Sequence, residues 1–288
     1  MNTLKKSERE LKTLELDGYK ISYLDIGEGE PVVFVHGTIS DYSVWEAQMD
    51  TFSENYRVIA LSRRYAYPND QTNSNSKDYS VKAHAKDLVG FLQKLNAGPV
   101  HLVGHSFGGF TSIISALERP DLIKSLTLLE PPATSLLENL PEAEGLMAEF
   151  INNVVIPASK AFNENNDEAA TALFVGGVMG DSLYFDKAPQ NEKGMWLANI
   201  PELKAYASGA DLLPLLNCQD FEKLKVPVLL IKGELSPKIF RLASDQLHKC
   251  IQNSTLEELP NASHGLQHQN PEGFNKIVLE FIEKHPMD

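Results

Sequence analysis

The sequence contains little cysteine. Among its 288 residues, Cys218 and Cys250 are the only two cysteines. Two cysteines do not make the disulfide framework of a small secreted domain, and their spacing does not match the clustered ligands of a zinc site. We therefore expect two chemically inert, mostly buried thiols and no metal site.

Positive charge and long apolar segments are also scarce. The chain has 26 Lys and Arg against 39 Asp and Glu, a net charge of −13. A general nucleic-acid binder or a partner of anionic membranes needs a basic face. No apolar run approaches the ~18 residues of a membrane-spanning helix, and residues 1–14 lack the apolar core of a signal peptide. We expect a cytoplasmic protein that binds neither nucleic acid nor membrane.

Hydrophobic residues make up 42% of the chain, enough for one large buried core. Short apolar runs alternate with longer stretches of helical periodicity, which is typical of an α/β fold with a mostly parallel sheet covered by helices on both faces. The pattern predicts strands at 19–25, 31–36, 57–62, 100–104, 123–130, 226–233 and 254–259, with 11–16 as a candidate edge strand. It predicts helices at 81–95, 107–117 and 271–284.

The alternation breaks once, between residues 131 and 217. These 87 residues contain no convincing strand and hold 12 acidic and four basic residues, so −8 of the net charge lies in less than a third of the chain. We interpret 131–217 as a largely helical cap insertion, and 1–130 together with 218–288 as the core domain. Several apolar residues of the insertion are candidates to line a pocket or to pack the cap: Leu136, Leu137, Met147, Phe150, Ile151, Phe174, Val178, Met179, Trp196 and Leu197.

The most informative local motif is Gly-His-Ser-Phe-Gly at 104–108, which follows an apolar strand and leads directly into a helix. In this context the serine occupies a strained turn that small neighbours permit, and its hydroxyl projects above the edge of the sheet. The following helix directs amide donors toward developing negative charge. Ser106 is therefore the candidate nucleophile.

From about Tyr19 onward the chain resembles the α/β-hydrolase superfamily. The resemblance rests on three motifs in the family's order: Phe-Val-His-Gly-Thr at 34–38, Gly-His-Ser-Phe-Gly-Gly at 104–109, and Asn-Ala-Ser-His-Gly at 261–265. It implies the α/β-hydrolase fold, with a mostly parallel central sheet flanked by helices.

The resemblance also indicates the base. His264 lies in a loop just after the last predicted strand, at the position of the family's catalytic histidine, where it can accept the Ser106 proton and return it to the leaving group. His268 is the second candidate. His36 is expected to shape the oxyanion loop rather than to titrate, and His105 occupies a neighbour position that is usually structural.

The third acid departs from the commonest family pattern, because Ser236 stands where an aspartate is expected after the seventh strand. Some relatives, including haloalkane dehalogenases and zearalenone lactonases, instead carry a glutamate at the end of the sixth strand, and Glu130 occupies that place here. It follows Ser106 by one helix and one strand, which returns the chain to the same edge of the sheet. We expect Glu130 to orient His264, with Glu234 as the alternative acid. A third interpretation is that Glu130 pairs with an arginine or lysine of the cap.

The resemblance places the oxyanion hole at the backbone amides of Thr38 and Phe107. Trp45 and Tyr65 are candidate substrate-binding residues, although a large aromatic is more often part of the core. After the fourth strand, where many relatives have Asp-x-x-Gly, this chain has Arg63 and Arg64. Either these arginines pair with nearby carboxylates, or one of them reaches the site.

These features predict a serine hydrolase of carboxylesterase or lactonase type that needs no cofactor and acts on a neutral or hydrophobic small molecule. The serine nucleophile disfavours dehalogenase and epoxide hydrolase activity, since those relatives use an aspartate. Two alternatives stay open: a cofactor-free haloperoxidase or perhydrolase, and a non-catalytic small-molecule receptor that uses the same pocket.

Overall fold

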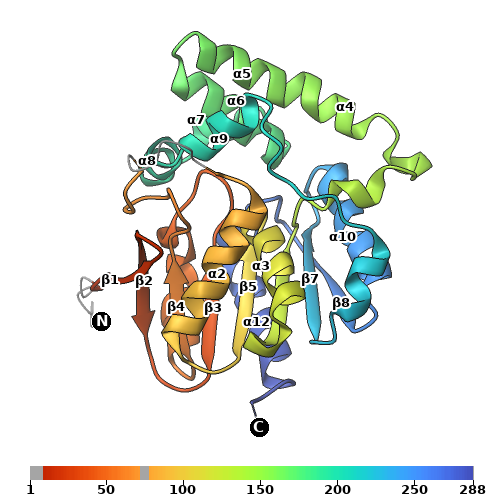
Figure 1. Ribbon diagram of the computed structural model, residues 1–288. Helices are drawn as coiled ribbons and strands as arrows, with labels where there is room; N and C mark the ends of the chain where they lie inside the picture. The colour runs from red at the N-terminus through yellow and green to blue at the C-terminus, as the bar shows by residue number, and fades with distance from the viewer. Residues whose placement is uncertain (1–8, 72–77, 288) are drawn as a thin grey trace.

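The protein is built around one eight-stranded sheet (Figure 1). The structure, a computed structural model, describes residues 9–71 and 78–287. The sheet has the order β1-β2-β4-β3-β5-β6-β7-β8. The strands are β1 Lys12–Leu16, β2 Tyr19–Ile26, β3 Pro31–Val35, β4 Arg57–Leu61, β5 Val100–His105, β6 Ile123–Leu129, β7 Val228–Gly233 and β8 Ser254–Leu259. Each predicted strand is present, including the candidate edge strand, and the predicted fold class is confirmed.

Strand order reverses at β3, and this reversal determines where a site can form. β1, β2 and β4 pair antiparallel, whereas all pairs from β4 through β3 to β8 are parallel. β3 pairs with β4 on one side and with β5 on the other. The chain leaves the carboxyl ends of β3 and β5 in different directions, which opens a crevice of the kind in which parallel sheets bind ligands.

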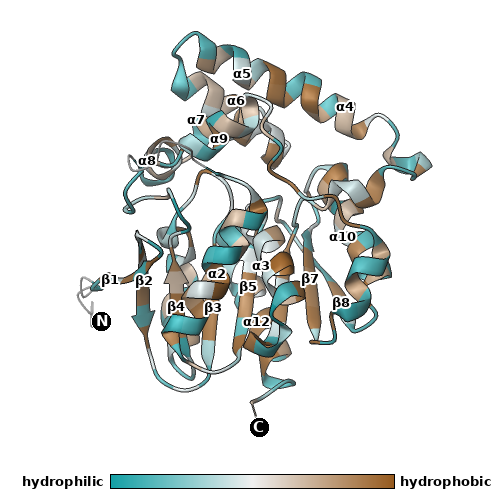
Figure 2. Ribbon diagram, viewed as in Figure 1, coloured by the Kyte–Doolittle hydropathy of each residue, from teal (hydrophilic) through white to brown (hydrophobic). Residues whose placement is uncertain are grey.

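Two apolar layers cover the sheet because its strands alternate their side chains between faces. Val33 packs in the layer formed with α2 (Val81–Leu95) and α3 (Phe107–Glu118), whereas its neighbours Val32 and Phe34 pack in the layer formed with α1 (Glu46–Ser53) and α12 (Pro271–Glu283). Brown strands between helices with teal outer faces show the same arrangement (Figure 2). Two further helices belong to this part of the chain: α10 (Lys238–Cys250) and α11 (Leu266–Gln269).

The helix predicted at 81–95 has those bounds in the structure. Its first turn is capped by Ser80, whose side chain accepts a hydrogen bond from the Ala83 amide, and it ends at Asn96 in the left-handed conformation. Its buried face includes Val81, Ala85 and Leu88.

The segment between β6 and β7 contains helices and no strand. It lies over the carboxyl end of the sheet, at the top of Figure 1. α4 and α5 continue into each other through a π-helical turn at Ile151–Val155. The elements are 3-10 turns at Thr134–Leu137 and Pro141–Ala143, then α4 Leu146–Phe150, α5 Ile156–Asn163, α6 Asp167–Met179, α7 Tyr184–Lys187, α8 Gln190–Ala198 and α9 Pro201–Ala207.

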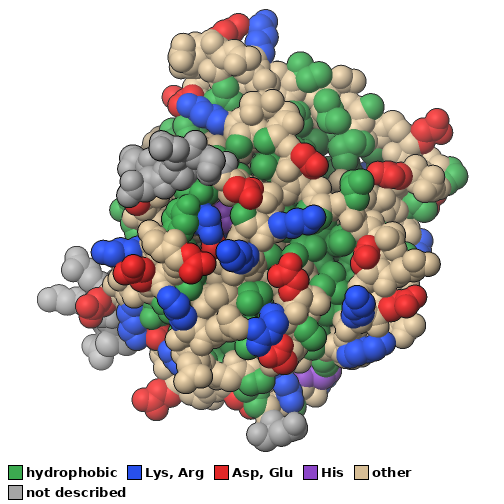
Figure 3. All heavy atoms as spheres, in the orientation of Figure 1, with side chains coloured by type: hydrophobic (Ala, Val, Ile, Leu, Met, Phe, Trp, Pro, Cys, Tyr) green, Lys and Arg blue, Asp and Glu red, His purple; other side chains and the backbone are tan. Residues whose placement is uncertain are grey.

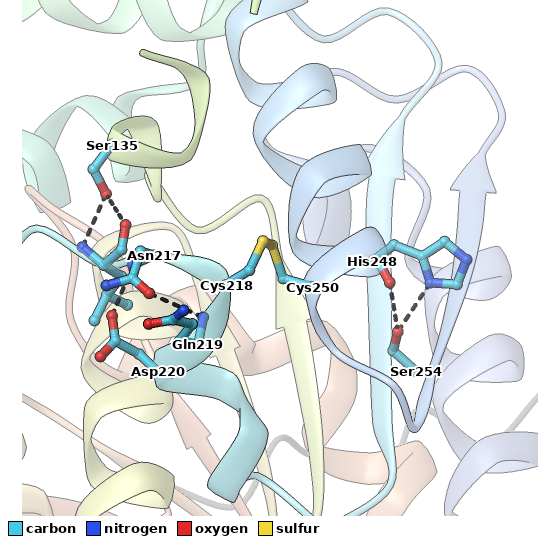
Figure 4. The surroundings of a disulfide bond; sticks show 9 residues. Ser135, Asn217, Cys218, Gln219, Asp220, His248, Cys250 and Ser254 are labelled. Carbon is cyan, nitrogen blue, oxygen red and sulfur yellow. Dashed lines mark hydrogen bonds between the residues drawn. A yellow bond between two sulfur atoms is a disulfide. The ribbon is translucent and has the colours of Figure 1, made fainter. Parts of the chain in front are cut away.

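The cysteine prediction was wrong, because Cys218 and Cys250 form a disulfide (Figure 4). Cys218 opens the 3-10 turn Cys218–Lys223 and is exposed, whereas Cys250 ends α10 and is partly buried. Their Cα atoms are 4.8 Å apart, within the range for a bridge. The two residues are separated by 32 positions, and only the folded arrangement of the turn and α10 brings them together.

The two ends of the helical segment are joined close to this disulfide. The Ser135 hydroxyl donates to the Leu216 carbonyl at 2.9 Å and accepts from the Leu216 amide at 3.0 Å. Asn217 and Asp220 then form a capping box that starts the turn of Cys218 (Figure 4). The junction between the segment and the rest of the chain is therefore fixed by hydrogen bonds as well as by a covalent link.

The surface mixes both signs of charge. Figure 3 shows acidic and basic side chains interspersed over the face it presents. Across residues 9–71 and 78–287, no helix combines the length and the apolar character needed to span a bilayer.

Candidate active site

Ser106 occupies a sharp turn between β5 and α3. Its backbone has φ 52° and ψ −122°, a conformation that costs a non-glycine residue free energy and is typical of strained functional turns. Gly108 makes the turn possible, because a Cβ at this position would overlap the His36 carbonyl oxygen. The serine side chain is therefore held at the carboxyl edge of the sheet by the strand before it and the helix after it.

His264 lies beside this serine. Its Nε2 is 3.0 Å from the Ser106 hydroxyl oxygen, and its side chain is 5% exposed. The Phe240 ring stacks on the imidazole with centroids 4.3 Å apart, which restricts its rotation. The next residue back, Ser263, is tied to Met179 and Gln269 by hydrogen bonds of 2.7 and 2.6 Å.

Glu130 completes a linear chain of hydrogen bonds. It directly follows β6 with φ 43°, is fully buried, and places Oε2 at 2.7 Å from His264 Nδ1. Its other oxygen, Oε1, accepts the Gly233 amide at 2.8 Å. A carboxylate in this position is matched by an N–H of the histidine on one side and a backbone N–H on the other, as a buried charge requires.

The structure brings Glu130, and not the alternative acid Glu234, to the histidine. Glu234 is exposed, and its carboxylate accepts the Asn261 amide at 2.9 Å. Ser236, at the position where an aspartate is more usual, is 6% exposed, and its hydroxyl has no hydrogen-bond partner among the described residues. The third interpretation, in which Glu130 pairs with an arginine or lysine of the insertion, has no such contact among the described residues.

Thr38 and Phe107 both lie next to Ser106, where two cavities meet. Thr38 lines both cavities, and Phe107 lines the smaller one. Phe107 is the first residue of α3, so its amide is one of the four at the helix start that have no partner within the helix. The loop that carries Thr38 approaches very closely, since a Cβ on Gly37 would lie 3.1 Å from the Ser106 Cβ. Both predicted oxyanion donors are thus placed beside the nucleophile.

The remaining histidines near the site are held in neutral form. His36 is fully buried, and burial together with the Arg63 charge lowers its pKa well below 6.5. Its Nδ1 donates to the Gly37 carbonyl and its Nε2 accepts the Arg63 amide, both at 2.8 Å. Burial likewise lowers the pKa of His105 well below its usual value, and burial and the neighbouring His264 lower that of His268 to about 4. His268 Nε2 is 3.2 Å from the Tyr184 hydroxyl, whereas the histidine hydrogen-bonded to Ser106 is His264.

Two cavities meet at Ser106. The first has a volume of about 70 Å³ and an almost entirely apolar wall, and the second has a volume of about 540 Å³ and a more polar wall. Thr38, Ser106, Phe174 and Val178 line both. The helical segment contributes further wall residues that the sequence offered as candidates, namely Met147 and Phe150 to the first cavity and Met179 and Trp196 to the second.

The predicted substrate contacts of Trp45 and Tyr65 are corrected by the structure. Trp45 is fully buried against Phe34 and Phe274 in the layer behind the sheet. Tyr65 is 4% exposed and packs against Tyr79. Neither residue lines a cavity that contains Ser106, because both rings are packed in the hydrophobic core.

Arg63 and Arg64 each pair with a carboxylate. Arg63 is buried beneath the site and forms a bidentate ion pair with Glu202 of α9, at 2.6 and 2.9 Å. Arg64 pairs with Asp87 of α2 and lies over the Tyr19 ring.

The sequence did not reveal two residues of the site. Glu202 resembles an ordinary acid in the first turn of a helix, and nothing in the sequence indicated that the Phe240 ring would stack on His264.

In the part of the chain that the structure describes, no group of three or more His, Cys, Asp or Glu is arranged to hold an ion.

Comparison with known proteins gives consistent matches along the chain. A family model described as "alpha/beta hydrolase fold" matches residues 30–271. The (E)-2-((N-methylformamido)methylene)succinate hydrolase of Acinetobacter baylyi is 24% identical over 282 residues, which cover 96% of this chain and 99% of that protein.

Two solved structures share the fold over nearly the whole chain. One is described as Est816, an N-acyl homoserine lactone degrading enzyme, with a TM-score of 0.74, 24% identity, and coverage of 94% of this chain and 100% of that one. The other is a thermophilic esterase from Thermogutta terrifontis, with a TM-score of 0.73 and 23% identity. The match covers 97% of this chain and 100% of that one.

Proposed function

Because the chain belongs to the α/β-hydrolase family, we propose that it is a serine hydrolase that cleaves a carboxylic ester or lactone through an acyl-enzyme intermediate. The observation that carries this proposal is the continuous chain of hydrogen bonds from Ser106 through His264 to Glu130. The names of the relatives agree with it, since they include a hydrolase, an esterase and a lactone-degrading enzyme.

The first half of the proposed reaction forms the acyl-enzyme. His264 Nε2 takes the proton of the Ser106 hydroxyl as the oxygen attacks the substrate carbonyl carbon. The carbonyl electron pair moves to oxygen, and the amides of Thr38 and Phe107 stabilise this oxyanion, at roughly 3–4 kcal/mol per donor. His264 then donates the proton to the leaving oxygen, and the carbon–oxygen bond breaks.

The second half repeats these steps with water. His264 takes a proton from a water molecule, which attacks the acyl carbon, and the same amides stabilise the second oxyanion. The proton passes to Ser106 as the carboxylic acid leaves. Throughout, Glu130 accepts a hydrogen bond from the N–H at Nδ1 of His264, so Nε2 stays free to act as the base. The carboxylate also stabilises the imidazolium that forms twice in the cycle. The reaction uses no metal and no organic cofactor.

We assign residues 131–217 as a cap and residues 1–130 with 218–288 as the core. The cap supplies most of the apolar wall of the 70 Å³ cavity, which suits the acyl group, whereas the 540 Å³ cavity suits the alcohol part or the ring of a lactone. The larger cavity is lined by Glu46 and Glu192, and no Lys or Arg is among its described lining residues. Neutral or hydrophobic small molecules are therefore the proposed substrates.

The proposal is tested with p-nitrophenyl esters of increasing acyl length and a set of lactones, assayed with the wild type and Ser106→Ala. Turnover by the wild type that Ser106→Ala abolishes supports a serine hydrolase. A fluorophosphonate probe read by peptide mass spectrometry identifies the reactive serine independently of substrate choice. Absence of both turnover and Ser106 labelling contradicts the proposal and favours a binding protein.

A further inference from the structure

The Arg63 side chain forms four hydrogen bonds near the site, and the proposed reaction does not use it. It is 4% exposed. Its Nε donates to the His36 carbonyl and its Nη2 to the Gly37 carbonyl, each at 2.9 Å. These carbonyls belong to the two residues directly before Thr38, so the guanidinium fixes the backbone that presents one oxyanion donor.

The same guanidinium also lies against the residue that presents the other donor. Its central carbon is 4.7 Å from the centre of the Phe107 ring. A cation above an aromatic face at this distance is attracted to it, more strongly when both are buried. Arg63 is thus in contact with both sides of the predicted oxyanion hole.

A carboxylate of the proposed cap neutralises the positive charge of Arg63. Glu202, in the first turn of α9, receives two hydrogen bonds from the guanidinium, and its side chain is only 9% exposed. Burial works against its charged form, but the Arg63 charge, together with the contacts of His84 and the hydrogen bonds of Arg63, more than compensates and lowers the pKa of Glu202 far below its usual range. His84 Nε2 lies 3.2 Å from the same carboxylate, and burial lowers the pKa of His84 below its usual value.

Glu202 also lines one of the cavities proposed to bind substrate. This is the 70 Å³ cavity next to Ser106, and Tyr206 on the following turn of α9 lines it too. A group bound in that cavity therefore touches the helix whose carboxylate holds Arg63, and one ion pair connects the substrate cavity, the cap and the oxyanion loop.

We propose that Arg63 and Glu202 are positioning residues that couple the placement of α9 to the geometry of the oxyanion hole. This inference rests on the proposed function. A buried arginine without its carboxylate has to reorganise or draw in water, because an unpaired charge in the interior is strongly unfavourable. Either response pulls on the carbonyls of His36 and Gly37 and moves the Thr38 amide away from its working position.

The coupling has a distinct kinetic signature. The oxyanion exists only in the transition states and the tetrahedral intermediates, so a displaced donor lowers kcat while ground-state binding stays nearly unchanged. Complete loss of one oxyanion donor costs roughly 10²- to 10³-fold in kcat, and a displaced donor costs part of that.

The experiment compares Glu202→Gln and Arg63→Lys with the wild type, using the best ester found for the protein. Glutamine keeps the size of the side chain without its charge. Lysine keeps the charge but has no planar fork to bond two carbonyls and a carboxylate together. We expect kcat to fall roughly tenfold or more in both variants, with KM within about threefold of the wild type. Affinity for a trifluoromethyl ketone, which forms a tetrahedral adduct, should fall in parallel with kcat/KM.

Arg64→Lys is the matched control, because Arg64 forms the neighbouring arginine–carboxylate pair with Asp87 and lines neither cavity at Ser106. It should keep the wild-type kcat. Unfolding temperatures of all variants are measured alongside. If Glu202→Gln does not fold, Glu202→Asp replaces it, since the shorter carboxylate retains the charge but withdraws from Arg63.

Unchanged kcat in folded Glu202 and Arg63 variants overturns the inference, and so does an equal loss of kcat in Arg64→Lys, which would indicate a general effect of destabilisation. A wild type without turnover and without Ser106 labelling refutes the proposed function instead, so the two failures are distinguishable.

Discussion

Replacing Glu130 with glutamine tests the proposed catalytic base through the position of a single proton. Glu130 Oε1 accepts the Gly233 amide at 2.8 Å, and Oε2 faces His264 Nδ1 at 2.7 Å. In Glu130→Gln the amide oxygen keeps the bond from Gly233, so the NH₂ group faces Nδ1. Nδ1 then has to accept a hydrogen bond, and the ring carries its proton on Nε2, the nitrogen that must receive the proton of Ser106.

The size of the effect follows from the two orientations of the new amide. The reverse orientation restores the working tautomer but points the NH₂ group at the Gly233 amide, and leaving a buried donor unpaired costs about 1–3 kcal/mol. The wrong tautomer of a serine-triad histidine lowers kcat by about 10⁴-fold. Either orientation also removes the negative charge that stabilises the imidazolium. We expect kcat to fall roughly 10²- to 10⁴-fold, with a small change in KM because Glu130 lines neither cavity.

The assay is ester hydrolysis under saturating substrate, with circular dichroism and thermal unfolding to verify the fold. Glu234→Gln is the control, because this carboxylate is exposed and accepts the Asn261 amide away from His264; the variant should keep kcat within about twofold of the wild type. A Glu130→Gln variant within threefold of the wild type would refute the reasoning. A large loss in Glu234→Gln would move the acid to the end of β7.

Three further predictions concern stability and specificity. Reduction of the disulfide, or Cys218→Ser, should lower the free energy of unfolding by about 3–4 kcal/mol, since the bridge closes a loop of 32 residues; an unchanged urea midpoint would contradict this. Burial lowers the pKa of His268 from 6.5 to about 4, so the unfolded chain binds a proton that the folded protein does not. Stability should therefore fall between pH 6.5 and 4 by up to about 2 kcal/mol after allowance for partial exposure, and His268→Gln should flatten the pH dependence of urea unfolding by that amount. A neutral ester should be turned over faster than its carboxylate-bearing analogue at low salt, with the difference narrowing as salt is added; the opposite order would refute the proposed preference.

The sheet and its covering helices were predictable because their signals are local. Apolar runs with short spacing identify buried parallel strands. In α2 the local sequence also determines where the helix begins and ends. Ser80 caps its start, Asn96 ends it in a left-handed conformation, and its apolar residues recur at helical spacing between these two points. No tertiary contact has to be known to place such a helix.

The chain of Ser106, His264 and Glu130 was predictable for a different reason. All three follow strands that end at the same edge of a parallel sheet, so the topology brings them together once the strands are assigned correctly. The resemblance to relatives with a glutamate after the sixth strand favours Glu130 over Glu234, and the return of the chain to the sheet edge that carries Ser106 supports the same assignment. The hydrogen bond to His264 agrees with that physical argument, and its catalytic role stays a prediction.

Trp45 and the two cysteines show where sequence reasoning failed. A tryptophan shortly after a site loop is compatible with a pocket and with a core, and only the packing of α1 and α12 decides that the ring turns away from Ser106. Cys218 and Cys250 carry no periodicity or spacing that reveals a bridge. Their proximity depends on how the end of the helical segment returns to α10, which is a property of the tertiary structure.

The Arg63–Glu202 pair represents the most consequential class of feature that a single sequence conceals. Each residue alone has an ordinary explanation, Arg63 as a surface charge after a strand and Glu202 as an acid near a helix start. Together they are buried in a cluster that no hydrophobic pattern encodes, and they join segments 139 residues apart. Replacing such a pair with apolar residues often costs no stability, so burial alone does not explain its presence. The contacts of Arg63 with both sides of the oxyanion hole supply an explanation, because a guanidinium bonds two backbone carbonyls and a carboxylate at once and thereby fixes a loop that apolar packing leaves free to shift.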